Sequence, residues 1–299
     1  MDCPRITLRQ DGPTFSRIVA GMWRLADWNL PLAERVRFIE QCIALGVTTF
    51  DHADIYGSYQ CQQLFGAALA HAPELKRQIQ LVSKCGIKLL SPHRPEHRIK
   101  HYDTSAAHIV TSTERTLAEL QVDTLDLLLI HRPDPLMDYD AMAGAFERLR
   151  ADGKVRHFGV SNFTPAQFEA LNSRIPLVTN QVEFSPLHLS PLTDGQFDCL
   201  QHHGVAPMIW SALGGGLLFA GDAGAQAVQD RLAMIAAELS VSPATLVYAW
   251  IMQLPCRPLP LTGSSRIEVV RDAVAAAAVT LERQQWYAIL EAACGHEVP

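Results

Sequence analysis

Four polar residues lie where the sequence predicts that buried strands end, and their side chains together suit acid–base chemistry on a carbonyl group. Asp51 ends the run TTFD, and Tyr56 follows in the next loop. Lys84 ends LVSK, and His131 ends LDLLLIH. A buried ammonium needs a compensating carboxylate, so we expect Lys84 to pair with Asp51. The ammonium would favour the phenolate of Tyr56 and lower the pKa of the phenol toward working pH.

The predicted chemistry is proton exchange with a substrate oxygen. A phenol held beside an ammonium can give a proton to a carbonyl oxygen, or take one back from an alcohol. Such general acid catalysis contributes about 10² to 10⁴ in rate. His131 is expected to orient the same oxygen and to share its developing charge. Each residue alone is also compatible with a structural role, because strand ends often carry such side chains, so the prediction depends on all four together.

Short β-branched runs alternate with helical stretches along the whole chain, and this alternation predicts parallel strands joined by helices. Two strands, LDLLLIH and PMIW, are apolar without alternation, as expected of strands that are covered on both faces. Thr164 and Ser242 each precede a proline and predict helix N-caps. After a hairpin at 6–8 and 15–17, the predicted strands are 18–23, 48–51, 79–84, 125–131, 155–161, 178–183, 206–211 and 259–261.

The choice between an open sheet and a closed barrel depends on a missing motif. A dinucleotide-binding open sheet should carry G-x-G-x-x-G after its first strand, where this sequence reads GMWRLADW. Eight strand–helix units in 299 residues fit an α/β fold of the (β/α)8 TIM barrel type. No polar linker divides the chain, so residues 1–299 are expected to form one domain. The irregular stretch 89–102 is expected to be a loop over the barrel mouth.

Composition excludes several classes of protein. The net charge is −6 and the basic residues are scattered, which argues against a nucleic-acid partner. The chain has no apolar run of about 20 residues, and residues 1–10 lack the features of a secretory signal, so we expect no membrane partner. The seven cysteines include no C-x-x-C motif. They are typical of reduced thiols, and a cytoplasmic location is expected.

The motifs around the four polar residues form a recognisable series. They are DHADIYG (51–57), SKCG (83–86), DLLLIHRPD (126–134), GKVRHFGVSNFTPAQF (153–168), NQVEFSP (180–186) and WSALGGGLL (210–218). In these motifs the sequence resembles the aldo-keto reductases over essentially its whole length, nearest to a little-characterised bacterial branch of general oxidoreductases. The resemblance implies a barrel with an N-terminal β-hairpin plugging its floor, and a catalytic tetrad of Asp51, Tyr56, Lys84 and His131. It also implies NADPH-dependent reduction of aldehydes or ketones, with Tyr56 as general acid.

The resemblance further assigns residues to NADP(H). Amide and hydroxyl side chains would read the nicotinamide carboxamide, and an aromatic ring would stack on the nicotinamide. A glycine-rich loop and the start of a helix with an arginine would hold the phosphates. The assigned residues are Ser161, Asn162, Gln181, Trp210, Ser211, Leu213, Gly214, Gly216, Gly263, Ser264, Ser265 and Arg266. Asp272 departs from the family at the adenine end, which leaves the strength of NADP preference open.

The substrate is expected to be a small carbonyl compound. Trp23 and Trp28 are predicted to line its pocket, with plain packing as the alternative for both. A monomer or weak homo-oligomer is expected.

A metal-dependent hydrolase is one alternative function. It would use His52, Asp54, His131 and Glu183, but strand geometry sends Asp51 and His52 to opposite faces.

A nicotinamide-binding regulatory or sensor subunit is the remaining alternative. It would keep Ser161, Asn162, Gln181 and Arg266 while its turnover became vestigial. The presence of all four tetrad residues favours the enzyme.

Overall fold

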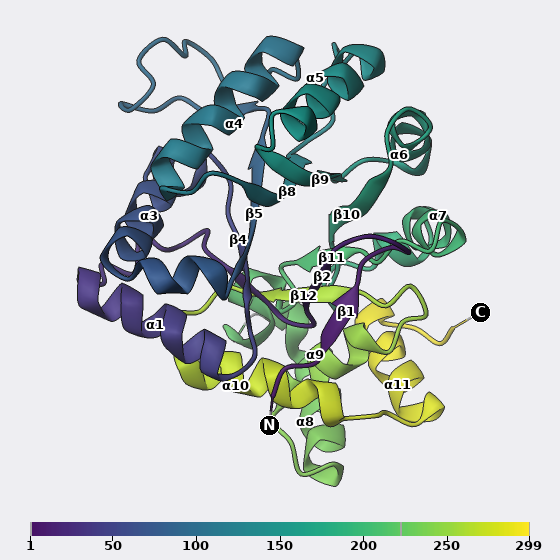
Figure 1. Ribbon diagram of the computed structural model, residues 1–299. Helices are drawn as coiled ribbons and strands as arrows, with labels where there is room; N and C mark the ends of the chain where they lie inside the picture. The colour runs from purple at the N-terminus through teal and green to yellow at the C-terminus, as the bar shows by residue number, and fades with distance from the viewer. Residues whose placement is uncertain (1, 222, 299) are drawn as a thin grey trace.

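Eight parallel strands close into a barrel in the computed structural model, which describes residues 2–221 and 223–298 (Figure 1). Strands that follow one another around the barrel are hydrogen-bonded neighbours, and β12 pairs with β3 to close it. The predicted TIM barrel is therefore confirmed. The barrel strands are β3 (Val19–Gly21), β4 (Thr49–Asp51), β5 (Gln80–Cys85), β8 (Leu125–Ile130), β9 (Val155–Ser161), β10 (Leu177–Glu183), β11 (Met208–Trp210) and β12 (Leu259–Thr262).

Helices surround the barrel and cover the outer face of its strands (Figure 1). Both predicted N-caps are present, since Thr164 Oγ1 accepts from the Gln167 amide and Ser242 Oγ accepts from the Thr245 amide. The main helices are α1 (Leu32–Ala44), α3 (Cys61–His71), α4 (Ala106–Leu120), α5 (Tyr139–Ala151), α6 (Pro165–Asn172), α7 (Gln196–His202), α8 (Gln226–Glu238), α9 (Pro243–Met252), α10 (Ile267–Ala275) and α11 (Arg283–Cys294). Shorter ones are α2 (Tyr56–Tyr59), η1 (Pro73–Arg77), η2 (Ser190–Leu192), η3 (Gly214–Phe219), η4 (Ala223–Ala225) and η5 (Ala276–Ala278).

Apolar side chains on both faces of the strands form two cores. This explains why apolar and polar residues do not alternate along the strand sequences. Leu127 and Leu129 belong to a cluster inside the barrel, whereas Leu128 and Ile130 pack outward in the cluster under the helices. Successive side chains of a strand point to opposite faces, so a strand between two cores must be apolar throughout. Among the described residues no single helix is long and apolar enough to cross a membrane, and α8 with α9 meets the criterion only as a bent pair.

The N-terminal hairpin, β1 (Arg5–Thr7) and β2 (Thr14–Ser16), closes the floor of the barrel as predicted. Leu8 and Phe15, which flank its turn, are buried in the inner cluster with the inward-facing strand residues. The Leu8 carbonyl accepts a hydrogen bond of 2.7 Å from the amide of Ala206, just before β11. Apolar packing and backbone bonding together fix the hairpin in place.

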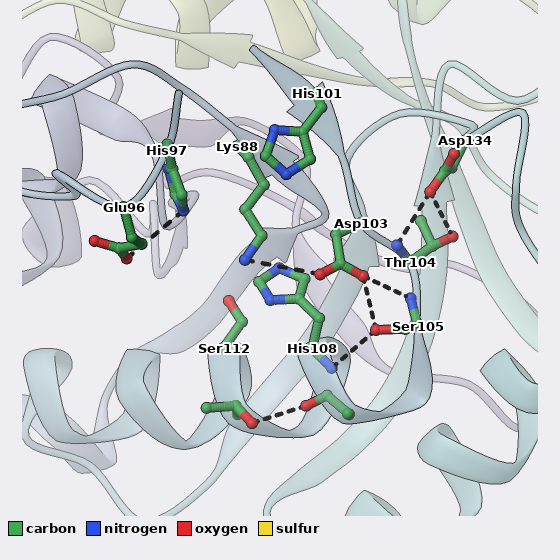
Figure 2. A network of polar contacts seen from close by, with 12 residues as sticks. Lys88, Glu96, His97, His101, Asp103, Thr104, Ser105, His108, Ser112 and Asp134 are labelled. Atoms are coloured by element: carbon green, nitrogen blue, oxygen red, sulfur yellow. Dashed lines mark hydrogen bonds and ion pairs between the residues drawn. The ribbon is translucent and has the colours of Figure 1, made fainter. Parts of the chain in front are cut away.

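Two short strands that the sequence did not predict flank residues 89–100 of the irregular stretch, and the second of them takes up its last two residues. β6 (Ile87–Lys88) and β7 (His101–Tyr102) pair antiparallel. Strands of two residues leave no periodic pattern, which is why sequence analysis missed them. Figure 2 shows the polar contacts that follow this pair: Lys88 Nζ lies 3.8 Å from an Asp103 carboxylate oxygen, and the Thr104 amide and hydroxyl both donate to Asp134. Asp134 thereby ties the segment after β8 to the segment before α4.

Candidate active site

The four polar residues predicted to act together do meet at one end of the barrel. Lys84 Nζ donates hydrogen bonds to Asp51 Oδ2 at 2.6 Å and to Tyr56 Oη at 2.9 Å. The ammonium and the carboxylate are both about 1% exposed. A third bond from Lys84 Nζ reaches the carbonyl of His52 at 2.9 Å, so all three protons of the buried ammonium have acceptors. The ion pair holds the phenol oxygen in a fixed place.

Backbone contacts between neighbouring strand ends position this group. Asp51 is the last residue of β4, which pairs with β5, the strand that carries Lys84. The loop after β4 returns to β5 because the Asp54 amide donates to the Lys84 carbonyl at 3.1 Å. Gly57 then turns the chain with a φ of +57°. A Cβ at Gly57 would lie 2.6 Å from the sulfur of Cys61, so only glycine fits beside Tyr56.

His131 follows β8 directly and presents its ring to Tyr56. The two rings meet edge to face, with centroids 6.0 Å apart. Burial, together with the charges of Lys84 and Arg132, holds the pKa of His131 well below its ordinary value. Its Nδ1 is buried and has no hydrogen-bond partner in the described part of the chain. The imidazole is therefore neutral at physiological pH.

The predicted lowering of the Tyr56 pKa is wrong. Burial, followed by the negative charge of Asp51, raises the pKa of Tyr56 well above its ordinary value. Burial also lowers the pKa of Lys84, although Asp51 opposes that shift. The ammonium is nearly cancelled by its carboxylate, so desolvation of the phenolate dominates. Tyr56 stays protonated at neutral pH, which is the form that a general acid needs.

The residues assigned to the carboxamide form a hydrogen-bonded series across β9, β10 and β11. Gln181 Nε2 donates to the other oxygen of Asp51 at 2.8 Å, and Ser161 Oγ donates to the Gln181 carbonyl at 2.9 Å. Asn162 Nδ2 donates to Ser161 Oγ at 2.7 Å, and Trp210 Nε1 donates to Asn162 Oδ1 at 3.0 Å. These hydrogen bonds connect the residues predicted to contact the nicotinamide with Asp51 of the predicted catalytic tetrad.

The residues predicted to bind phosphate lie on two open backbone segments. Leu213 precedes η3, and Gly214, Gly215 and Gly216 have positive φ angles of 60°, 66° and 102°. A Cβ at Gly216 would meet nothing within 4 Å, whereas one at Gly214 would lie 2.8 Å from a Leu187 carbon. The amides of Gly214 and Gly216 donate to the carbonyls of Ser211 and Leu213 at 2.7 and 3.0 Å, so the loop bonds these two amides internally and does not present them to an anion.

The second segment is the start of α10. Arg266 is its exposed N-cap residue, and the Arg266 amide donates to Ser264 Oγ at 3.2 Å. Gly263 and Ser265 lie in the same turn after β12. Asp272 lies further along α10, where its carbonyl accepts from Thr245 Oγ1. A helix N-terminus with an exposed arginine fits a phosphate, so the chemistry of these donors fits an anionic dinucleotide.

The two tryptophans predicted for the substrate pocket differ in their surroundings. Trp23 lies just beyond β3 and is 57% exposed, with the Arg24 guanidinium 5.2 Å from its ring. Trp28 packs against Phe38 of α1, with ring centroids 5.4 Å apart. Packing therefore accounts for Trp28, while Trp23 remains available to a ligand.

Two arginines that sequence analysis missed lie near the predicted cofactor residues. The Arg132 guanidinium lies 5.5 Å from the Trp210 ring, and Arg24 Nη2 donates to the Gly215 carbonyl at 3.0 Å. Arg132 has no hydrogen bond or ion pair with any residue of 2–221 and 223–298. The motif HRPD contained Arg132, but the sequence does not show the direction of a long side chain.

The residues of the hydrolase alternative are divided between two faces of the barrel wall. His52 is fully buried, and its ring lies 4.5 Å from the ring of Phe65 on α3. Burial, and then the charge of Lys84, lower the pKa of His52 to about 3. His131 instead faces Tyr56. His52 therefore acts as an outward-facing packing residue, as the alternation of strand side chains predicted.

Comparisons with known proteins agree with this geometry. The sequence profile of the Aldo/keto reductase family matches residues 17–293. The oxidoreductase YdhF of Escherichia coli is 55% identical over 298 residues, 99% of each chain. A 6-dehydroglucose reductase of Agrobacterium fabrum is 42% identical over 297 residues, 98% of this chain and 99% of the relative. The structure of a glycerol dehydrogenase from Gluconobacter oxydans aligns with a TM-score of 0.84 at 23% identity, covering 98% of this chain and 95% of the other, and shows the same fold.

Proposed function

The chain belongs to the aldo/keto reductase family and is a nicotinamide-dependent oxidoreductase, and on that premise we propose that it reduces small aldehydes or ketones with NADPH, using Tyr56 as the general acid. The observation that carries the proposal is the 2.9 Å contact between Lys84 Nζ and Tyr56 Oη beside the buried Asp51 carboxylate. Catalysis needs interactions that strengthen as the transition state forms. A phenol with a bonded ammonium provides one, because its oxygen gains negative charge as the proton leaves.

Each tetrad residue has a distinct task in the proposed reaction. A bound reduced nicotinamide supplies the hydride that reaches the carbonyl carbon. Tyr56 gives its proton to the carbonyl oxygen, and the Lys84 ammonium stabilises the phenolate left behind. Asp51 holds the ammonium in place and remains ionised. The neutral imidazole of His131 donates a hydrogen bond to the same oxygen and thereby orients the carbonyl.

A carbonyl panel tests the proposed function. The purified protein would be assayed for oxidation of NADPH and of NADH with aldehydes and ketones, including 6-dehydroglucose, the compound named for the Agrobacterium relative. We expect steady turnover with at least one carbonyl and a preference for NADPH. NADPH binding without turnover on any of these compounds would contradict the proposal and favour the regulatory subunit.

Replacing Arg266 with alanine is expected to weaken NADPH binding about 10- to 100-fold, the range for losing a charge-assisted hydrogen bond to phosphate. NADH lacks the 2′-phosphate, so its affinity should change little. Fluorescence titration of both dinucleotides measures the difference. Arg37→Gln, at an exposed position on α1, serves as the control for net charge. Equal weakening of both dinucleotides would contradict the phosphate contact.

Arg132 is proposed to set a substrate preference, because it follows His131 in the chain and its guanidinium, which has no ion pair among the described residues, lies over Trp210. A free guanidinium pairs most strongly with a carboxylate. We expect Arg132→Gln to lower kcat/KM about 10- to 100-fold for succinic semialdehyde and to leave butanal unchanged. Steady-state kinetics on both aldehydes decide this, with Arg37→Gln as the matched charge control. An equal loss on both aldehydes would assign Arg132 to a general role.

A further inference from the structure

Three side chains of types that bind metal ions converge between α6 and α7, on helices outside the barrel. Glu169 belongs to α6, Cys199 belongs to α7, and His203 is the C-cap residue directly after α7. His203 Nε2 lies 3.8 Å from Glu169 Oε1, and Cys199 Sγ lies 4.0 Å from the same oxygen. All three donor atoms lie within 4.8 Å of one another. Figure 1 shows the two helices side by side, away from β4, β5 and β8, whose ends carry the tetrad.

The spacing of these donors fits a tetrahedral site. Zinc binds sulfur at about 2.3 Å and nitrogen or oxygen at about 2.0 to 2.2 Å, so its ligands are separated by roughly 3.5 Å. The observed separations exceed this by a few tenths of an ångström for two pairs, a difference that rotation of the exposed Glu169 side chain can supply. Cys199 and His203 are four residues apart on one helix, so they share a face, as paired ligands on helices do.

Among the described residues, the only polar contacts of these donor atoms are the long ones to Glu169 Oε1. His203 Nε2 is shielded from solvent and has no hydrogen-bond partner among the described residues. The ring of Phe168, on α6, packs against the ring of His203 with centroids 5.8 Å apart and limits its rotation. Cys199 is a free, partly exposed thiol. A histidine held in place with an unused ring nitrogen beside a thiol and a carboxylate is an arrangement that a metal ion would complete.

We propose that Glu169, Cys199 and His203 bind one divalent zinc ion, with water as the fourth ligand. Mixed sulfur, nitrogen and oxygen donors in tetrahedral array select zinc over calcium or magnesium, which prefer oxygen alone. The ion joins α6 to α7. The site therefore acts on the stability of this side of the barrel and leaves the reductase reaction unchanged.

Cobalt provides the direct test, because a thiolate bound to Co²⁺ absorbs in the near ultraviolet and tetrahedral Co²⁺ absorbs strongly in the visible. The full chain, reduced and freed of metal, would be titrated with Co²⁺ and then with Zn²⁺. We expect one Co²⁺ per chain, both absorption features, and displacement by Zn²⁺. Cys199→Ser should abolish the ultraviolet feature and weaken Zn²⁺ binding at least about 10-fold, whereas Cys294→Ser, at the exposed free thiol of α11, should change neither.

A second measurement does not depend on the folding of a variant. In the wild-type chain Zn²⁺ should slow alkylation of Cys199 and not of Cys294, as followed by peptide mass spectrometry.

The melting temperature should rise with Zn²⁺ in the wild type and in Cys294→Ser, and remain unchanged in Cys199→Ser and His203→Gln. Absence of the thiolate band, its persistence in Cys199→Ser, or equal alkylation of Cys199 with and without Zn²⁺ would each overturn the proposal.

Discussion

Replacing Tyr56 with phenylalanine is expected to lower kcat by about 10²- to 10⁴-fold, the contribution of a positioned general acid. The variant loses the hydroxyl that Lys84 Nζ contacts at 2.9 Å and keeps the ring that packs edge to face with His131. The dinucleotide is expected to bind as before, with its Kd within a few fold of the wild-type value. Single-turnover kinetics separate the chemical step from binding and product release.

The pH dependence of kcat/KM in the wild type tests the same role of Tyr56. Reduction uses the protonated phenol, so activity is present below the Tyr56 pKa and is lost as pH rises through it. Burial raises that pKa above its ordinary value of about 10, so titration of Tyr56 should cause no loss of kcat/KM below about pH 10. The residual activity of Tyr56→Phe should lack the alkaline limb altogether. A wild-type loss centred near pH 7 to 8, or an unchanged kcat in the variant, would remove Tyr56 from its proposed role.

Replacing Lys84 with methionine is expected to abolish most turnover and also to destabilise the fold. The variant leaves the Asp51 carboxylate buried without its ammonium, and breaking such a pair costs about 3 to 5 kcal/mol. The phenol of Tyr56 also loses the positive charge that stabilises its phenolate in the transition state. Thermal unfolding and steady-state kinetics measure the two losses separately.

A double variant distinguishes loss of stability from loss of catalysis. Asp51→Asn combined with Lys84→Met removes both charges, so no carboxylate is left unpaired. We expect its melting temperature to recover much of the loss while kcat remains low. Gln181, which donates to the other oxygen of Asp51, can still bond to the amide of the asparagine. Recovery of activity together with stability would mean that Lys84 has only a structural role.

The barrel could be predicted because its determinants are local. Apolar runs such as LDLLLIH mark strands between two cores, and proline after Thr164 or Ser242 marks a helix start. The convergence of Asp51, Lys84 and His131 follows from the topology, because parallel neighbours end at the same edge. These features depend on residue type and order, which the sequence displays directly.

Features that depend on burial and on side-chain direction could not be predicted in the same way. The sequence places an ammonium near Tyr56, but only the structure shows how completely the phenol is desolvated, and desolvation reverses the direction of its pKa shift. Trp28 and Trp23 are similar in sequence context, yet Trp28 packs on Phe38 and Trp23 faces solvent. The Arg132 guanidinium lies 5.5 Å from the ring of Trp210, which belongs to a strand that is not a neighbour of β8, and no local pattern specifies this contact.

The position of the N-terminal hairpin at the floor of the barrel affects folding during translation. The ribosome makes Leu8 and Phe15 long before Met208 and Leu259, which are among their partners in the inner cluster. The Leu8 carbonyl likewise cannot form its hydrogen bond until the amide of Ala206 has been made. These two apolar side chains therefore remain without those partners until β11 and β12 have been made, while a nascent chain is prone to aggregation. Moving the chain ends by circular permutation, so that the hairpin is translated after β12, should shorten the time for which a chaperone binds the nascent polypeptide.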